Sequence, residues 1–381
     1  MPELADYTHC SGCSACMNSC PVEAISMPAD QEGFLRPSVN RRLCIECGKC
    51  TASCPVLSPY PERKNGKVWT AVNRDEEIRL ASSSGGIFSL LAQKTIAKGG
   101  IVFGGCFDEN QEVVHSYSET MEGISVFRGS KYVQSRLGTI FQSAKNFLDD
   151  GRNVLFSGTP CQIAGLNRFL DEEYPNLTTV DIICHGVPSP AVWRNYIDGL
   201  IPAHKNMRIN FRDKSIGWEE FSFTIQDAGS KAVLYTEMFR RNIFMNGFLK
   251  NLYLRPSCSC CKSKGCASGS DVTLGDFWGI RNFFPDFYDN KGVSAVLLHS
   301  HKAMEILSDV DIEFNEVPYE TVLKGNPALE ISCAAHPNRT RFFNRFIRKN
   351  EPVSGLIAHY LKPGIWVRIK QRLSNFLHDN R

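Results

Sequence analysis

The sequence predicts an α+β or α/β protein in two parts: a small cysteine-rich unit and then a larger domain built on a mixed sheet. Three observations predict this class. Two copies of one four-cysteine run stand within the first 56 residues. Beyond them, short runs rich in β-branched and aromatic residues alternate with helical patterns. The length of 381 residues also exceeds what one compact domain usually needs.

The composition fits a globular protein with a substantial core, since 43% of the residues are hydrophobic and 22% are charged. There is no run of about 18 apolar residues, and the first residues are acidic and lack the apolar stretch of a secretory signal. We therefore expect a cytoplasmic location, where thiols stay reduced. Sixteen cysteines in that setting indicate metal or redox chemistry rather than disulfides.

Changes in composition divide the chain into four segments. The cysteine-dense segment covers 1–57, and 58–66, which contains proline, glycine and mixed charge, is expected to be a linker. The main domain then covers 67–335. The last segment, 336–381, is a basic tail with helical patterns; from residue 339 onward it holds ten Lys and Arg against two Asp and Glu.

The main domain is expected to begin with an alternation of strands and helices, which favours some parallel pairing. The strands are predicted at 67–72, 99–107, 153–158 and 178–184, and the helices at 85–99, 162–173 and 190–201. A more antiparallel section is expected next, at 207–213, 221–227 and 231–239. The chain should return to strand at 270–280 and 293–300.

Both cysteine runs have the spacing C-x2-C-x2-C-x3-C-P, and the second follows the first at an offset of 34 residues. In such a run three thiolates can bind one cubane, while the cysteine before proline reaches the partner cluster. We therefore predict two [4Fe-4S] clusters with crossed ligands. The first is assigned to Cys10, Cys13, Cys16 and Cys54, and the second to Cys20, Cys44, Cys47 and Cys50.

The alternative is a pair of structural zinc sites, but zinc needs only four thiolates per site and no crossed ligand. Two identical four-cysteine runs fit that chemistry poorly. Residues 5–57 strongly resemble the bacterial 2[4Fe-4S] ferredoxin module, which implies a relay for single electrons.

Four loops of the main domain are candidates for a ligand site: 82–88, 157–166, 184–193 and 270–279. Ser and Gly at a helix N-terminus leave N–H groups free for an anion such as phosphate. Strand-end loops of one sheet can gather at a common crevice. Each loop taken singly is more simply an ordinary helix cap or a proline-stiffened turn, but together they favour a site.

Four motifs carry a second resemblance: "RGSKYVQS" (128–135), "LFSGTPCQIAGL" (155–166), "DIICHGVPSP" (181–190) and "SDVTLGDFWGI" (270–280). They resemble the coenzyme F-420 (deazaflavin) hydrogenase/dehydrogenase beta-subunit family. With the ferredoxin-like segment, the resemblance spans about residues 5–300. It implies an FAD-dependent iron–sulfur oxidoreductase, in which flavin passes electrons between one-electron clusters and a two-electron substrate or a deazaflavin-like coenzyme.

By carry-over from this resemblance, the flavin is expected among residues of three of the motifs and of the 82–88 loop. These residues are Ser84, Gly85, Gly86, Lys131, Tyr132, Gln134, Thr159, Pro160, Gln162 and Asp276. Lys131 could balance an anionic charge on the cofactor, or be a solvated surface lysine. Tyr132 could stack on a ring or pack in the core. His185 could donate a proton near the flavin, or only hydrogen-bond a neighbouring turn.

Eight cysteines remain outside the two runs. Cys161 and Cys184 lie in two of the strand-end loops, and Cys258 and Cys261 have C-x2-C spacing. These four could hold a third [4Fe-4S] cluster. One alternative is a local metal site that uses Cys260 or Cys266, and the other is that these thiols bind no metal. Cys106 and Cys333 are expected to be buried apolar side chains.

The tail sequence 364–377 places apolar residues on one helical face and could lie on an anionic membrane surface, dock a partner or pack on its own domain. Positive charge at one end with no recognition motif argues against nucleic-acid binding. Expected partners are an electron carrier such as ferredoxin, or a hydrogenase or dehydrogenase subunit. In the latter case the chain would be an electron-transfer subunit without its own catalysis; a non-catalytic zinc scaffold is a third hypothesis.

Overall fold

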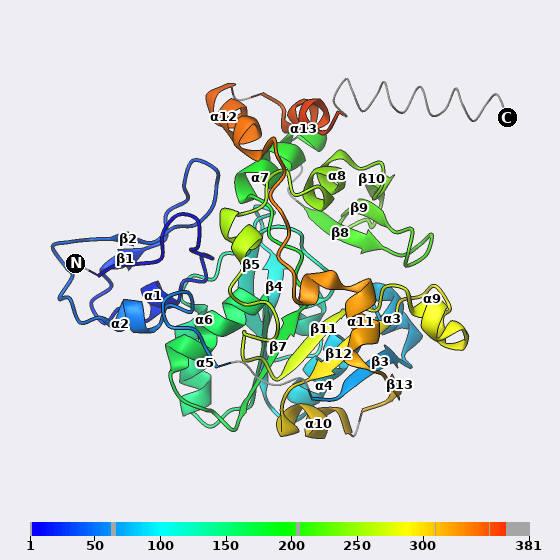
Figure 1. The fold of residues 1–381 in the computed structure, drawn as a ribbon. Coiled ribbons are helices and arrows are strands. Elements are labelled where there is room, and N and C mark those ends of the chain that lie inside the picture. The colour runs from blue at the N-terminus through cyan, green and yellow to red at the C-terminus, as the bar shows by residue number, and fades with distance from the viewer. Residues whose placement is uncertain (1, 62–65, 203–205, 309, 350, 363–381) are drawn as a thin grey trace.

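The computed structural model describes residues 2–61, 66–202, 206–308, 310–349 and 351–362. Its centre is an eight-stranded sheet in the order β13-β3-β12-β11-β7-β6-β4-β5 (Figure 1). The strands are β3 (Val68–Asn73), β4 (Ile101–Phe107), β5 (Val113–Ser118), β6 (Val154–Gly158), β7 (Leu177–Ile182), β11 (Val272–Asp276), β12 (Ser294–Leu298) and β13 (Ile312–Glu316). The mixed α/β class is thus confirmed.

The middle of this sheet is parallel and its edges are antiparallel. β4, β6, β7 and β11 pair in parallel, β5 is antiparallel to β4, and β12, β3 and β13 continue antiparallel on the other side. The carboxyl ends of the parallel strands therefore share one edge. The loops that begin at Gly158, Ile182 and Asp276 leave from that edge, so three of the four candidate loops are gathered as predicted.

Helices cover both faces of the sheet because its strands alternate their side chains between two cores. Val102 and Leu155 point to the core under α4 (Ile87–Ala97) and α10 (His301–Ser308). Phe103 and Phe156 point to the opposite core under α5 (Ile140–Asp149) and α6 (Pro160–Leu170). A further core forms around Phe277 and Val293, beside α9 (Ile280–Phe283) and α11 (Tyr319–Gly325).

A separate three-stranded antiparallel sheet, β10-β9-β8, confirms the predicted antiparallel section. It packs with helices α7, α8, α12 and α13 over an aromatic core that includes Trp193, Phe211 and Phe244. These elements are β8 (Met207–Asp213), β9 (Ser222–Asp227), β10 (Val233–Met238), α7 (Pro190–Leu200), α8 (Ile243–Leu249), α12 (Arg339–Lys349) and α13 (Val353–Leu361).

The structure contains elements that the sequence did not predict, among them β5, α5, α8, α10, α11 and β13. A short helix, α3 (Glu76–Ala81), precedes the 82–88 loop, and the strand expected at 270–280 ends at Asp276 before α9. The expected tail helix at 364–377 lies outside the described residues. Within those residues, no helix is both long and apolar enough to cross a membrane.

The N-terminal region lies against one side of the main domain (Figure 1). It contains α1 (Ala15–Asn18), α2 (Lys49–Ala52) and a small sheet of β1 (Ile25–Ser26) and β2 (Ser38–Val39). Cys13 and Ala15 belong to the same apolar core as α5 and α6. The cysteine-rich region is therefore packed into the larger domain and not merely tethered to it.

Candidate functional site

The first predicted thiol set lies around one cavity. Cys10, Cys13, Cys16 and Cys54 all line it, and it encloses about 360 Å³ of space, part of it open to solvent. Cys16 is in α1, and Cys54 follows α2 at a distance in sequence from the other three. The cavity thus combines three cysteines of the first run with the last cysteine of the second.

The second predicted set lines a second cavity, of about 320 Å³. Its cysteines are Cys20, Cys44, Cys47 and Cys50, again three from one run and the last from the other. The ligand roles stay a prediction, but the grouping of the thiols in the structure is the predicted crossed one.

The two runs reach these cavities through the same backbone geometry. Gly12 and Glu46 occupy equivalent positions, two residues after the first cysteine, and both have left-handed φ angles of 70° and 55°. Ser14 and Gly48 are likewise equivalent, with φ of 60° and 75°, and each caps a four-residue helix. Left-handed residues bend the chain sharply, so that thiols two residues apart can face one centre.

The thiols of the first set are held in an apolar environment. Burial raises the pKa of Cys16 to about 12 and that of Cys13 well above its ordinary value, and the neighbouring thiols add to both rises. Metal binding must release these protons. Among the described residues, no three His, Cys, Asp or Glu side chains converge tightly enough to hold a single metal ion; each set of four thiols instead borders a cavity.

A third group of thiols lies inside the main domain. Burial raises the pKa of Cys161 to about 11, with a further rise from the charge of Cys261. Burial also raises the pKa of Cys184 to about 12, and there Cys161 and Cys261 both contribute. Burial likewise raises the pKa of Cys258 well above its ordinary value, and the charges of Cys184 and Cys161 add to the rise. The four cysteines that sequence reasoning combined across about a hundred residues are therefore neighbours in space.

The other cysteines of this region differ in their surroundings. The Cys260 thiol lies near the carbonyl oxygen of Thr8, at 3.9 Å, rather than with the interior thiols. Cys106 is buried as expected. Cys333 is not fully buried: it is partly accessible, and its thiol lies 3.6 Å from the carbonyl oxygen of Cys258, so the expectation for this residue was wrong in part.

Helix α6 connects the first and the third thiol sets. Cys161 lies in its first turn, and Gly165 lies one turn later on the same face. A Cβ atom at Gly165 would come within 2.9 Å of both the Cβ and the Sγ of Cys13. The absence of a side chain at Gly165 is thus what lets the N-terminal region approach the start of α6.

The residues expected to bind flavin fall into two groups. In the first, Arg212 forms an ion pair with Asp276 at 2.8 Å and donates to the hydroxyl of Tyr132 at 3.3 Å. Trp218 donates from its indole nitrogen to Asp276 at 2.7 Å. Tyr132 itself stacks on Phe248, with ring centroids 4.7 Å apart, so it packs in the core.

The loop before α4 joins this first group. Arg212 donates to the carbonyl oxygen of Ser83, and Lys214 to that of Ser84. Burial lowers the pKa of Lys214 to about 7, and the neighbouring Arg79 and Arg212 add to that effect.

The two glycines of this loop have structural roles. Gly85 lies against β3 and β12, where a Cβ would come within 2.4 Å of the Ala71 carbonyl oxygen. Gly86 caps α4 with a φ of 85°.

In the second group, Thr159, Pro160 and Gln162 form the start of α6. The main-chain nitrogen of Thr159 donates to Gln162 Oε1 at 2.9 Å, and Pro160 takes the first helical position. Gln162 also donates to Ser135, whose hydroxyl lies 2.8 Å from His115 Nδ1. Because His115 is buried, its pKa is lowered to about 4.

The remaining predicted residues have protein partners of their own. Lys131 donates to the carbonyl oxygens of Val126 and Arg128, and burial lowers its pKa to about 7. Gln134 contacts the N-terminal region, donating to the Ser11 carbonyl oxygen at 3.1 Å. His185 lies 2.6 Å from Asn251 Oδ1, and burial lowers the pKa of its ring.

Sequence reasoning missed four of the residues that organise these sites: His115, Arg212, Lys214 and Arg255. None lies in a cysteine run or in a loop of the recognised motifs. Arg212 and Lys214 alternate with Asp213 at the end of β8, which sequence alone presents as an ordinary charged strand end. Only the packing of β8 beside Asp276 and Ser84 gives them a role.

Comparison with known proteins assigns two parts of the chain. Residues 9–57 match the 4Fe-4S dicluster domain, and residues 151–318 match the family described as the C-terminal part of the coenzyme F420 hydrogenase/dehydrogenase beta subunit. Among curated proteins, ferredoxin-type protein NapF of Escherichia coli K12 is 43% identical over 44 residues, which are 12% of this chain and 27% of that one. Ferredoxin 7Fe of Hydrogenibacillus schlegelii is 37% identical over 65 residues, 16% of this chain and 77% of that one.

Among solved structures, a chain of the F420-reducing [NiFe] hydrogenase complex from Methanosarcina barkeri aligns with a TM-score of 0.48 and 16% identity. The alignment covers 76% of this chain and 96% of that chain.

Proposed function

We propose that this iron–sulfur protein is an FAD-dependent oxidoreductase, because residues 9–57 match the 4Fe-4S dicluster domain and residues 151–318 match the coenzyme F420 hydrogenase/dehydrogenase beta-subunit family. It would pass electrons between its [4Fe-4S] clusters and FAD, and from there to a two-electron substrate or a deazaflavin-like coenzyme. The observation that carries the proposal is the pair of cavities, each lined by four cysteines in the crossed arrangement.

The cysteines would hold the clusters as follows: one at Cys10, Cys13, Cys16 and Cys54, and the other at Cys20, Cys44, Cys47 and Cys50. Such clusters accept and release single electrons. The protein surrounds the first cavity with apolar groups such as Leu4, Met27 and Val56. It leaves Cys47, on the second, exposed. A one-electron carrier such as ferredoxin would therefore approach on the Cys47 side.

The interior thiols would hold a third cluster, with Cys161, Cys184, Cys258 and Cys261 as ligands. Their mutual proximity supports this set over a local site of residues 258–266, because Cys260 is directed to the Thr8 carbonyl oxygen. Lys264 donates to the carbonyl oxygen of Cys184 and so brings an ammonium group near the interior thiols.

The group around Arg212 fits an anionic cofactor such as FAD. Arg212 Nε is buried and has no hydrogen-bond partner among the described residues, although the rest of its guanidinium is bound to Asp276 and Tyr132. Buried donors are normally satisfied. Flavin, when bound, converts two-electron into one-electron transfer. Arg212 and the N-terminus of α4 would bind its phosphates and hold it in place, while Lys214, whose ammonium group donates to the carbonyl oxygens of Arg79, Ser84 and Lys291, would fix the loop before α4.

Anaerobic purification from native cells tests the proposal. We expect about twelve irons per chain, or about eight if the interior site is empty, together with one flavin. Protein without flavin, whose visible spectrum does not change on addition of FAD, would refute the flavin part and leave the relay. A stable complex with a hydrogenase or dehydrogenase subunit, with no turnover by the isolated chain, would favour the alternative of an electron-transfer subunit without its own catalysis.

A further inference from the structure

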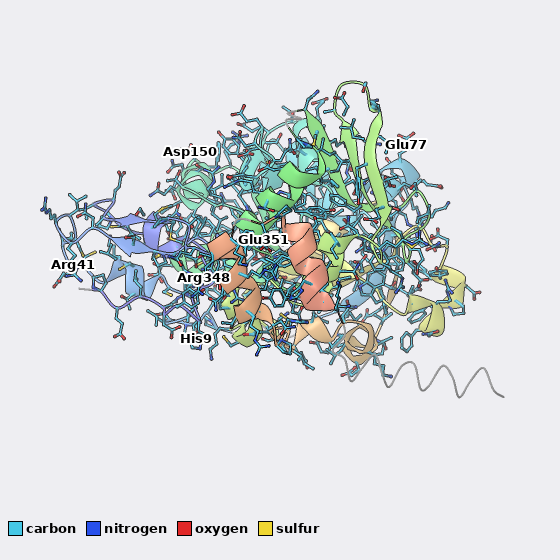
Figure 2. All side chains as sticks on the ribbon, turned by 90° about the horizontal axis from the view of Figure 1, so that it is seen from above. His9, Arg41, Glu77, Asp150, Arg348 and Glu351 are labelled. Carbon is cyan, nitrogen blue, oxygen red and sulfur yellow. The ribbon has the colours of Figure 1, made fainter. Side chains whose placement is uncertain are left out.

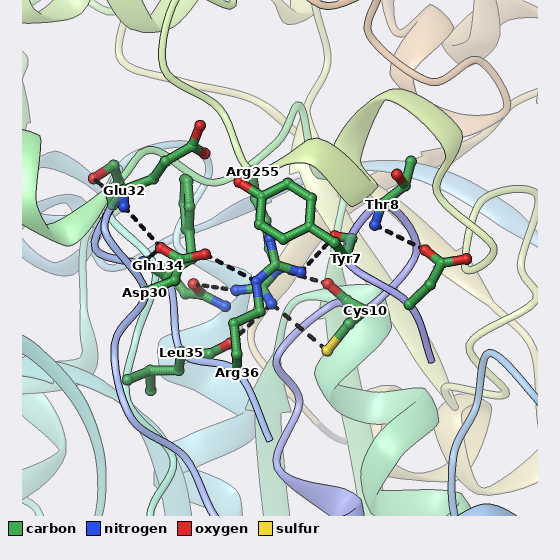
Figure 3. Close-up of polar contacts among 12 residues, drawn as sticks. Tyr7, Thr8, Cys10, Asp30, Glu32, Leu35, Arg36, Gln134 and Arg255 are labelled. Carbon is green, nitrogen blue, oxygen red and sulfur yellow. Dashed lines mark hydrogen bonds and ion pairs between the residues drawn. The ribbon is translucent and has the colours of Figure 1, made fainter. Parts of the chain in front are cut away.

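Arg255 occupies an unusual place for an arginine. Its side chain is 1% exposed, immediately before the short helix Pro256–Cys260, and it reaches across to the N-terminal region. Figure 3 shows its guanidinium among main-chain and thiol groups of that region. It donates to the Cys10 carbonyl oxygen at 2.7 Å, to the Leu35 carbonyl oxygen at 2.9 Å and to Gln134 Oε1 at 2.9 Å.

The remaining contact of Arg255 is with a predicted cluster ligand. Its Nη2 lies 3.7 Å from the Sγ of Cys10, within the range of a hydrogen bond to sulfur. Arg255 also adjoins the interior set: the main-chain nitrogen of Cys258 donates to the Arg255 carbonyl oxygen at 3.0 Å, and the charges of Cys258 and Cys161 favour the protonated guanidinium. Arg255 is therefore a neighbour of both the first and the interior thiol sets.

Two carboxylates of the same interface are paired with other arginines. Asp30 pairs with Arg36 at 3.0 Å, and Glu32 pairs with Arg339. In the described part of the chain, the acceptors bonded to Arg255 are two carbonyl groups, one amide and the Cys10 thiol. A guanidinium does not lose its proton in proteins, and a buried charge without a counter-charge is strongly unfavourable. The thiols are thus its available source of negative charge.

The N-terminal region is shaped to admit this guanidinium. Gly12 has a left-handed φ of 70°, and a Cβ there would lie 2.8 Å from Arg255 Nη1 and 2.8 Å from Gln134 Nε2. The glycine therefore serves the approach of Arg255 as well as the bend of the cysteine loop.

We propose that Arg255 is a fixed positive charge shared by two iron–sulfur centres, and that it raises the reduction potential of the first by bonding to the Cys10 sulfur. The first centre is the one at Cys10, Cys13, Cys16 and Cys54; the second is the one at Cys161, Cys184, Cys258 and Cys261. Hydrogen bonds to ligand sulfur and nearby positive charge both stabilise the reduced, more negative state. This inference rests on the proposed function, and it makes Arg255 a positioning residue that acts through Cys10.

The test is a redox titration of the anaerobic protein, followed by EPR, for wild type, Arg255→Met and Arg255→Lys. In Arg255→Met, we expect the ratio of reduced to oxidised first centre at a fixed potential to fall at least about tenfold, a lowering of about 59 mV for one electron. In Arg255→Lys, which keeps the charge but not the fork of donors, we expect a smaller fall of about threefold. The centre at Cys20, Cys44, Cys47 and Cys50 should keep its potential.

Arg36→Met is the matched control. Arg36 is another largely covered arginine of this interface, paired with Asp30, and its side chain is 13% exposed. Its loss should shift the potential of the first centre clearly less than Arg255→Met does, even if stability falls, because Arg36 is paired with Asp30 and does not bond to Cys10. Unchanged potentials in both Arg255 variants, or an equal shift in Arg36→Met, would overturn the proposal. If Arg255→Met does not fold, the Arg255→Lys titration decides alone. Wild-type protein without iron would instead refute the proposed function, so the two failures are distinguishable.

Discussion

The N-terminal cysteines and the interior cysteines differ in how the chain brings them together and in how water reaches them. The N-terminal eight come from two short runs, whose spacing alone sets the local geometry. The interior four come from α6, the loop after β7 and the segment 258–261, and they meet only because the fold packs that segment against the loop after β7, where Val187 donates to Cys258 Sγ at 3.4 Å. Cys47 is exposed, whereas each of the interior four is only partly accessible.

This contrast in exposure indicates which end of the molecule meets an electron-transfer partner. Leu43 and Ile45, beside Cys47, are 50% and 62% exposed, as expected of a surface that meets another protein. Each of the four interior thiols is only partly accessible. The Cys47 end is thus the more open to a partner, while the interior set adjoins residues proposed for the two-electron cofactor, since Cys161 lies between Pro160 and Gln162.

The largest expected effect separates the interior set from its neighbours in sequence. Cys258→Ser or Cys261→Ser should remove one whole cluster, about four of about twelve irons, because a cubane needs its full ligand set. Cys260→Ser is the matched control and should lose none. Iron and sulfide analysis of the anaerobic proteins measures this. Equal iron in Cys261→Ser and Cys260→Ser would mean that the interior thiols bind no cluster.

A second experiment compares the accessibility of the sets. An iron chelator added anaerobically to the holoprotein should release iron in phases, the first from the centre that contains exposed Cys47. The interior thiols are only partly accessible, so release from their site should be at least about tenfold slower. Absorbance of the iron–chelator complex follows the reaction. A single phase for all the iron would contradict the contrast between the regions.

A smaller effect is expected at the contact between the regions. Gly165→Ala would force a Cβ into Cys13 and should lower the unfolding free energy by about 1–3 kcal/mol. Gly199→Ala, in α7, is the control: a Cβ there meets nothing within 4 Å, so the substitution should stabilise the helix by up to about 1 kcal/mol. Denaturant unfolding measures both. Similar stability of the two variants would mean that the N-terminal region does not press on α6.

The smallest effect concerns the open end. Arg41 and Arg42 are exposed beside the Cys44–Cys50 run, and Figure 2 shows Arg41 at the outer end of the N-terminal region, away from Arg348. The double variant Arg41→Glu/Arg42→Glu should slow electron transfer from a reduced acidic ferredoxin about fivefold at low salt, with the difference lost at high salt. Stopped-flow absorbance measures it. Arg348→Glu should behave as wild type; if it slows the reaction equally, the ferredoxin does not dock at this end.

The sequence predicted the parts whose geometry is local. The crossed grouping of Cys20 with Cys44 follows from spacing, and many of the strands and helices from 67 to 300 follow from hydrophobic periodicity. β5, α5 and α8 were not predicted. The sequence could not predict Arg212 or Arg255, because their roles depend on which segments the fold places opposite them. It also left Cys161 and Cys258 with three possible states, since nothing local determines whether thiols a hundred residues apart will meet.

The contact of Gly165 with Cys13 also bears on how such a chain could be rebuilt. A cysteine-rich unit taken from another protein would have to fit against Gly165, one helix turn from Cys161, and leave space at the position of Gly12 for a guanidinium. The two halves are therefore not interchangeable parts joined by a linker: replacing either one requires redesigning the surface of the other.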